Sequence, residues 1–229
     1  MRETFERTET KYLISREQLK EILNLTNDYL QTDRFFKGNL MSIYYDTDSY
    51  QMIRCSIEKP EYKEKIRIRS YDDVEDNDSV YVEYKKKYNG IVYKRRTTVG
   101  YKDAMENLYD ASFEDRQVAK EIKRGLIFYK DVKPKIFIST RRYSYRGKED
   151  ENLRITFDLD MKYRTDNLCL KRSDKDKTIS DGIVMEIKTV NPYPLWLVKV
   201  LNETKAYPQS FSKVGEAYIR ELKNGGIIL

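Results

Sequence analysis

The sequence contains no histidine, and this absence removes several kinds of chemistry at once. Histidine-based triads, histidine general bases, histidine-ligated zinc and phosphohistidine intermediates all need an imidazole. Any catalysis by this chain must therefore depend on carboxylates, Lys, Arg and hydroxyl groups, with a cation that prefers oxygen ligands.

Cysteines and long apolar runs are also scarce. The two cysteines, Cys55 and Cys169, lack CxxC spacing and form no disulfide framework, which is consistent with a reducing compartment. No apolar run approaches the roughly 20 residues of a membrane span, and residues 1–20 lack the apolar core of a signal peptide. We expect a cytoplasmic protein with no membrane span, folded as one domain over residues 1–229.

Charged residues, in contrast, make up 36% of the chain, with 44 Lys+Arg against 38 Asp+Glu. The resulting net charge of +6 favours an anionic partner without requiring nucleic acid. The 20 tyrosines and the basic run at residues 93–96 could serve RNA binding, but both fit alternating strands. We therefore expect no nucleic-acid partner.

Short runs that alternate polar and apolar residues predict an antiparallel sheet of about eight strands. The runs cover residues 7–14, 41–46, 63–69, 80–86, 91–99, 134–142, 153–159 and 183–188. Helical spacing covers residues 15–30, 103–128, 194–204 and 212–223, and Ser15 with Gln18 forms a capping-box pattern at the first of these. The pattern predicts an α+β fold with helices packed outside the sheet.

The polar faces of these strands share one composition. Because side chains alternate along a strand, the polar faces carry Lys65, Arg67 and Arg69; Tyr81, Glu83 and Lys85; Arg154, Thr156 and Asp158; and Glu186 and Lys188. In residues 91–99 the polar face is either Lys94, Arg96 and Thr98 or Tyr93, Arg95 and Thr97. Any single strand could simply turn this face to water. Repetition on every strand favours a closed tunnel with a charged lumen, neutralised by a polyanion and a divalent cation.

Six segments carry a family resemblance. They are RTETKY (7–12), KIRIRSY (65–71), VEYKKKYNGIVYKRR (82–96), RRYSYRGKEDENLRITFD (141–158), VMEIKT (184–189) and SFSKVGEAY (210–218). In this order they resemble the triphosphate tunnel metalloenzymes of the CYTH-like superfamily, and most of all the VTC (vacuolar transporter chaperone) polyphosphate polymerase domain. In that family a basic residue replaces the first glutamate of the opening motif, as Arg7 does here.

The resemblance implies a set of site residues. Those expected to act on phosphate are Lys11, Arg67, Arg69, Lys85, Lys94, Arg142, Arg154, Ser212 and Lys213, with Glu186 as a metal ligand. Strand alternation adds Arg96 and Lys188 as phosphate-binding residues and Glu9, Glu83 and Asp158 as metal ligands. We expect Lys11, Arg67, Arg69, Lys85, Arg142 and Arg154 to be catalytic.

Two positions depart from the expected pattern. Ser210 stands where the family has a lysine before its Ser-Lys pair. Strict alternation in residues 134–142 places Arg141, and not Arg142, with the polar residues Lys135 and Ser139, unless a bulge intervenes. The family motif favours Arg142 as the lumen residue, and Arg141 remains the alternative.

The resemblance implies a polyphosphate polymerase that uses Mn²⁺ or Mg²⁺ and transfers the γ-phosphate of ATP to a growing polyphosphate chain. If water is the acceptor, the enzyme is a triphosphatase, and a non-catalytic polyphosphate-binding module is a third alternative. Arg7, in place of a metal-binding glutamate, favours the polymerase over the hydrolase. The expected ligands are ATP, triphosphate or polyphosphate, and a membrane protein is a possible partner.

Overall fold

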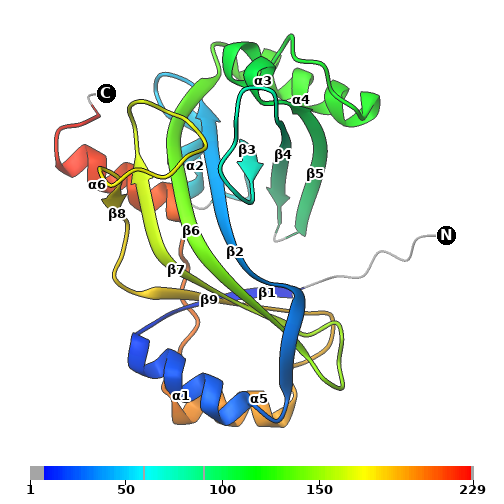
Figure 1. The fold of residues 1–229 in the computed structure, drawn as a ribbon, viewed down its shortest axis with the longest axis vertical. Helices are drawn as coiled ribbons and strands as arrows, with labels where there is room; N and C mark the ends of the chain where they lie inside the picture. Colours follow the sequence, from blue (N-terminus) through cyan, green and yellow to red (C-terminus); the bar gives the residue numbers. More distant parts are fainter. Residues whose placement is uncertain (1–7, 59, 90, 228–229) are drawn as a thin grey trace. The chain divides into compact units, whose positions relative to one another are not determined.

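The computed structural model describes residues 8–58, 60–89 and 91–227, which form an α+β fold with an antiparallel sheet (Figure 1). Its strands are β1 (Thr8–Ile14), β2 (Leu30–Asp46), β3 (Tyr62–Ser70), β4 (Ser79–Tyr88), β5 (Ile91–Gly100), β6 (Lys133–Gly147), β7 (Arg154–Arg164), β8 (Lys177–Thr178) and β9 (Ile183–Thr189). Its helices are α1 (Arg16–Thr26), α2 (Gln51–Glu58), α3 (Tyr101–Asn107), α4 (Arg116–Tyr129), α5 (Leu195–Glu203) and α6 (Lys213–Lys223). Within these residues, no helix is long and apolar enough to cross a membrane.

The predicted strands and helices are present with differences in length, and the helix α2 and the short strand β8 were not predicted. Arg7, at the start of the first predicted strand, lies outside the described residues. The capping box of Ser15 and Gln18 is formed at the start of α1. The block predicted as helical over residues 103–128 is divided into α3 and α4. The sequence did not indicate α2, whose first amides are satisfied from outside the helix: Met52 and Ile53 donate to the buried Asp46 carboxylate at 2.9 and 2.7 Å. A short helix whose first amides are capped by a residue several positions before it shows little sequence pattern of its own.

The expected closed tunnel is not confirmed, because the strand order is open. The order is β1-β9-β7-β6-β2-β3-β4-β5, with β8 paired to β7. Irregular segments cover the outer edges of the terminal strands. Beside β1, Gln209 N donates to Lys11 O at 2.7 Å, and beside β5, Glu114 N donates to Thr98 O at 3.2 Å. These hydrogen bonds engage backbone carbonyl groups at the sheet edges, which a further strand would otherwise bind.

The chain divides into two compact units. In the part of the chain described, the first unit holds residues 8–39, 140–161 and 180–211, and the second holds residues 40–139, 162–179 and 212–227. Strands β2, β6 and β7 contribute residues to both. The prediction of a single domain stays a prediction, and each unit is described by itself.

The first unit has its own apolar core beneath β1, β9 and β7. Buried residues of these strands, such as Tyr12, Phe157 and Met185, pack with α1 and α5, which lie side by side (Figure 1). Tyr12, Phe157 and Met185 alternate with polar neighbours, so burial of this face turns Lys11, Asp158 and Glu186 to the other side of the sheet.

The second unit has a separate core beneath β3, β4 and β5. Ile66, Ile68 and Val82 are completely buried there, together with residues of α3 and α4. Gly125 of α4 lies so close to Tyr84 of β4 that an added Cβ would stand 2.6 Å from the tyrosine Oη. This packing turns the residues between the buried ones, including Arg67 and Glu83, toward the opposite face.

Candidate functional site

The polar face of β3, β4 and β5 in the second unit carries an ordered array of cations. Antiparallel pairing aligns these strands so that their polar residues form rows across the sheet. One row holds Lys65, Lys85 and Lys94; the next holds Arg67, Glu83 and Arg96; the third holds Arg69, Tyr81 and Thr98. We call its six basic side chains and Glu83 the cation array.

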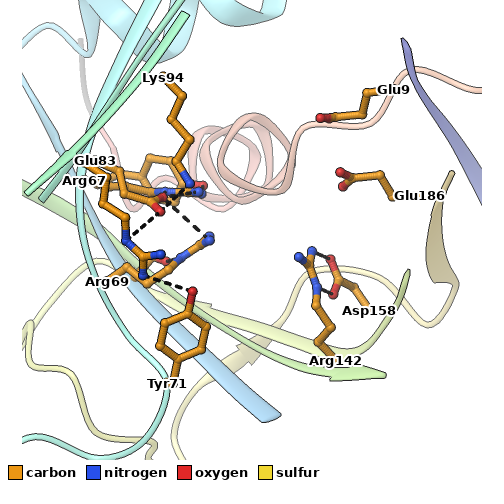
Figure 2. A network of polar contacts seen from close by, with 12 residues as sticks. Glu9, Arg67, Arg69, Tyr71, Glu83, Lys94, Arg142, Asp158 and Glu186 are labelled. Carbon is orange, nitrogen blue, oxygen red and sulfur yellow. Dashed lines mark hydrogen bonds and ion pairs between the residues drawn. The ribbon is translucent and has the colours of Figure 1, made fainter. Parts of the chain in front are cut away.

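Glu83 is the hub of the cation array, and its side chain is only 1% exposed. Arg67 donates to Oε2 from Nε and Nη2 at 2.8 and 2.6 Å, and Arg69 Nη1 lies 3.6 Å from the same oxygen. Lys94 Nζ and Arg96 Nε lie 2.6 and 3.7 Å from Oε1. Figure 2 shows Arg67 and Arg69 of β3 and Lys94 of β5 directed at this carboxylate.

The charges around Glu83 control its ionisation. Burial alone would raise the pKa of Glu83, but the charges of Arg67, Arg69 and Lys94 outweigh burial and hold this pKa far below its usual value. The carboxylate is therefore ionised, and it neutralises one of the six positive charges. The remaining surplus favours a polyanion.

The pairing also settles which face of β5 carries the site. Lys94 and Arg96 reach Glu83, whereas Arg95 Nε donates to Glu121 of α4 at 3.0 Å, on the other face of the sheet. The alternation Lys94, Arg96 and Thr98 is thus the one that the structure adopts.

Two residues of β2 at the edge of the array were missed from the sequence. Tyr44 Oη accepts a hydrogen bond from Arg67 Nη1 at 2.7 Å, and Ser42 Oγ accepts one from Arg69 Nε at 3.2 Å. Burial would raise the pKa of Tyr44, but Arg67, Lys65 and Arg69 together lower it to about 7. Alternation in residues 41–46 places Ser42 and Tyr44 on one face, but only the register of β2 against β3 sets Tyr44 opposite Arg67.

The start of α6 adds the Ser-Lys pair to the second unit. Ser212 is the N-cap of this helix, and its Oγ accepts from Gly215 N at 3.3 Å. Lys65 Nζ donates to the same oxygen at 3.0 Å, so β3 and the helix start are joined directly. Lys213 is the first residue of α6. A helix N-terminus with two lysines suits an anionic ligand.

The first unit brings a second charged group together on β1 and β9. Pairing places Glu9 opposite Lys188 and Lys11 opposite Glu186. Lys188 Nζ lies 2.6 Å from Glu186 Oε1 and 3.6 Å from Glu9 Oε2, so one ammonium lies between the two carboxylates. Burial would raise the pKa of Glu186, but Lys188, Lys11 and Arg142 lower it to about 2.

The arginines of β6 and β7 in the first unit each have a carboxylate partner. Arg142 donates from Nε and Nη2 to the two oxygens of Asp158, both at 2.6 Å, and Asp158 is completely buried (Figure 2). Arg154 Nη2 lies 2.7 Å from Asp33 Oδ2. Arg141 reaches Asp160 at 3.1 Å. Asp160 has a left-handed backbone with φ 49°, which departs from the extended conformation of a strand.

The four predicted metal carboxylates do not form a single cluster. In the residues described, no three His, Cys, Asp or Glu side chains come together as a group able to hold a metal ion. Glu83 is bound by basic side chains, and Asp158 is held by both donors of Arg142. Glu9 and Glu186 remain a pair on one ammonium. Mg²⁺ is commonly held by one or two carboxylates together with phosphate oxygens, so Glu9 and Glu186 are the residues that could hold a divalent cation.

Comparisons with known proteins show the family and the fold of the chain. The family model described as the VTC domain matches residues 6–220. No curated protein matches the chain in sequence. Among solved structures, a candidate adenylate cyclase from Bacillus halodurans is similar, with 14% identity, a TM-score of 0.56 and coverage of 89% of this chain and 92% of that one. This similarity shows a shared fold.

Two further structures are more distantly similar. PH1819 from Pyrococcus horikoshii OT3 and a candidate adenylate cyclase from Vibrio parahaemolyticus are 15% and 10% identical, each with a TM-score of 0.47. Both alignments cover 96% of this chain; they cover 99% of the PH1819 chain and 98% of the Vibrio parahaemolyticus chain.

Proposed function

The chain belongs to the VTC domain family, and on this basis we propose that it is a metal-dependent polyphosphate polymerase that transfers the γ-phosphate of ATP to a growing polyphosphate chain. The observation that carries the proposal is the cation array, in which six basic side chains share one sheet face and four of them contact a single ionised carboxylate. An array with this surplus of charge binds a chain of phosphates better than a neutral or cationic ligand.

Arg67, Arg69, Lys85 and Lys94 bind the phosphate oxygens of ATP in this proposal. Guanidinium forks suit the paired oxygens of a phosphate, and the lysines contribute compact charges between them. Glu83 holds two of the arginines in place before the substrate binds, since it contacts both Arg67 and Arg69. The conformational entropy of these side chains is then lost on folding, so that binding of the substrate does not have to order them.

Glu186, with Glu9, would hold the divalent cation, Mn²⁺ or Mg²⁺. The bound cation supplies charge neutralisation to the phosphates. Lys188, Lys11 and Arg142 lower the pKa of Glu186 and so keep this carboxylate ionised.

The transfer itself needs positioning and charge stabilisation. A terminal oxygen of the acceptor phosphate attacks the γ-phosphorus of ATP, the bond from that phosphorus to the β,γ-bridging oxygen breaks, and ADP leaves. The arginines and lysines stabilise the negative charge that develops on the equatorial and leaving oxygens. The chain lacks histidine, so direct in-line transfer suits its side chains better than a phosphohistidine intermediate.

Glu186→Gln separates turnover from binding. The variant removes one carboxylate and no cation, so we expect polymer formation from ATP with Mn²⁺ or Mg²⁺ to fall steeply while calorimetry still shows triphosphate uptake. A matched control is Glu216→Gln, which changes a partly exposed glutamate of α6. Polymer yield equal to that of the parent would remove Glu186 from the mechanism.

An assay of the parent protein distinguishes the three candidate functions. It is incubated with ATP and either metal, and polymer and free phosphate are measured separately. Polymer supports the proposal, free phosphate alone indicates a triphosphatase, and binding without turnover indicates a polyphosphate-binding module. A cytoplasmic location and a membrane partner protein stay predictions from the sequence.

A further inference from the structure

A pocket of about 560 Å³ lies beside β5 in the second unit. It forms where residues 113–116 run along the edge of the strand. Val99 pairs with Phe113, and Asp115 N donates to Thr97 Oγ1 at 3.0 Å. Because backbone and side-chain hydrogen bonds fix this segment, the pocket is formed before any ligand arrives. Its volume lies within the range of small-molecule sites.

One wall of the pocket is a stack of planar groups. The Arg96 guanidinium carbon lies 3.6 Å from the ring centroid of Tyr81. Arg96 Nη2 also donates to Tyr71 Oη at 3.0 Å, and the Tyr71 and Tyr81 rings meet edge to face at 5.9 Å. Tyr81 is nevertheless 36% exposed. Exposed aromatic rings and guanidinium planes held in this way are surfaces on which nucleobases stack.

The residues of segment 113–116 that line the pocket include two carboxylates. Glu114 and Asp115 line the pocket together with Arg116. Asp115 Oδ1 is engaged as the N-cap of α4, where it accepts from Gln117 N and Val118 N at 2.8 and 3.0 Å. Glu114 is exposed and presents an acceptor to the pocket wall. A carboxylate repels phosphate and accepts hydrogen bonds from hydroxyl and amino groups.

Arg96 joins the pocket to the cation array. Its guanidinium lines the pocket, and its Nε lies 3.7 Å from Glu83 Oε1. A ligand that fits both surfaces has an uncharged aromatic part with hydroxyl or amino groups and, next to it, a row of anionic groups. A nucleoside triphosphate has this chemistry.

We propose that this pocket binds the nucleoside of the nucleoside triphosphate substrate, with its base against the Tyr81–Arg96 stack and Glu114 accepting from a ribose hydroxyl or an exocyclic amine. The inference rests on the proposed function, because it assumes that the cation array binds the phosphates. It adds recognition of the base and ribose, which inorganic triphosphate lacks.

Calorimetric titration of ATP and of inorganic triphosphate, both without metal, tests the assignment. In Tyr81→Ala we expect the Kd for ATP to rise about tenfold while the Kd for inorganic triphosphate stays unchanged, as loss of one stacking contact predicts. Glu114→Gln should likewise weaken ATP and spare inorganic triphosphate. The control is Tyr88→Ala, which removes an exposed tyrosine from the far end of β4 and should alter neither affinity.

A second measurement guards against a Tyr81 variant that folds poorly. Fluorescence of 2-aminopurine ribonucleoside triphosphate should be quenched by the parent, and excess inorganic triphosphate should displace the probe. Equal weakening of ATP and inorganic triphosphate in Tyr81→Ala, or no quenching by the parent, would overturn the nucleoside pocket. If the parent binds ATP but not inorganic triphosphate, the proposed phosphate site fails and the pocket stands; if it binds neither, both fail.

Discussion

At the scale of single residues, the candidate site depends on side chains whose ionisation is set by their neighbours. Glu83 is buried yet ionised, because cations on β3 and β5 surround it. Tyr44 is buried and has its pKa lowered to about 7 by Arg67, Lys65 and Arg69. Both groups contribute negative charge that partly balances the positive charges of the array, and a polyanion bound as proposed would compete with them for the same cations.

Glu83→Gln should destabilise the ligand-free protein. Removing the charge of a buried, paired carboxylate leaves several cations uncompensated, and we expect the free energy of unfolding to fall by about 3 kcal/mol. Saturating inorganic triphosphate should reduce this loss, because its phosphates replace the missing charge. Urea unfolding with and without triphosphate measures both values.

The matched control for this variant is Glu121→Gln on α4. Glu121 pairs with Arg95 at the surface, so its loss should cost less than about 1 kcal/mol and should not depend on triphosphate. If Glu83→Gln loses the same stability with and without triphosphate, Glu83 and the ligand do not compete for the same cations.

The lowered pKa of Tyr44 predicts that the free energy of unfolding changes with pH in a defined direction. Its folded-state pKa of about 7 lies below the usual value of 10.0, so folding favours the phenolate. This contribution to the free energy of unfolding is complete above the usual pKa, and it is lost as the pH falls through 7. Absorbance at 295 nm should therefore show one tyrosine titrating near pH 7 in the parent and none in Tyr44→Phe. Added triphosphate should move that titration to higher pH, and a titration unchanged by triphosphate would contradict the proposed overlap of sites.

At the scale of elements, strand alternation determines which side chains belong to the site. Arg95 and Arg96 are neighbours on β5, yet Arg95 contacts Glu121 of α4 and Arg96 contacts Glu83. On β4, Lys86 lies 4.6 Å from the Tyr84 ring centroid, on the core side, while Lys85 pairs in register with Lys65 and Lys94. β4 and β5 therefore each supply a cation inside the array and a matched cation outside it.

Alanine substitution of these neighbouring cations tests the face assignment. Lys85→Ala and Arg96→Ala should each weaken triphosphate binding by about 1.5–3 kcal/mol, the range for a hydrogen bond to a charged group. Lys86→Ala and Arg95→Ala remove the same charges from the other face and should change binding by less than about 0.5 kcal/mol. Calorimetry measures all four variants. Equal weakening within each pair would mean that net charge, and not the array, attracts the ligand.

At the scale of the whole molecule, two compact units each have an apolar core and a charged group on the sheet. The second unit has the cation array with its surplus of positive charge. The first unit has a nearly balanced set, with Glu9, Glu186 and Asp158 contacting Lys11, Lys188 and Arg142. We therefore expect anions to act mainly through the second unit and the divalent cation through the first.

Ligand-linked stability provides a test on the intact chain. Inorganic triphosphate at about 100 times its Kd should raise the free energy of unfolding by about 2.7 kcal/mol through mass action. High salt should reduce this gain, because ions screen charges that are partly exposed. Calorimetric melts at low and high NaCl measure the effect, with Arg67→Ala as the variant that should lose most of it. No shift in the parent at low salt would contradict a triphosphate site.

The sequence by itself determined which residues share a face, because side-chain direction alternates along a strand wherever that strand lies in the fold. The absence of histidine, most strand and helix positions and the VTC family followed from the same local information, whereas α2 and β8 did not. Only the tertiary structure decided the partners: Arg67 and Lys94 meet on Glu83, Arg142 holds Asp158, and Glu9 and Glu186 share Lys188. Those contacts depend on the pairing and register of strands distant in sequence, as do the place of Tyr44 beside Arg67 and the open strand order, and no local pattern encodes them.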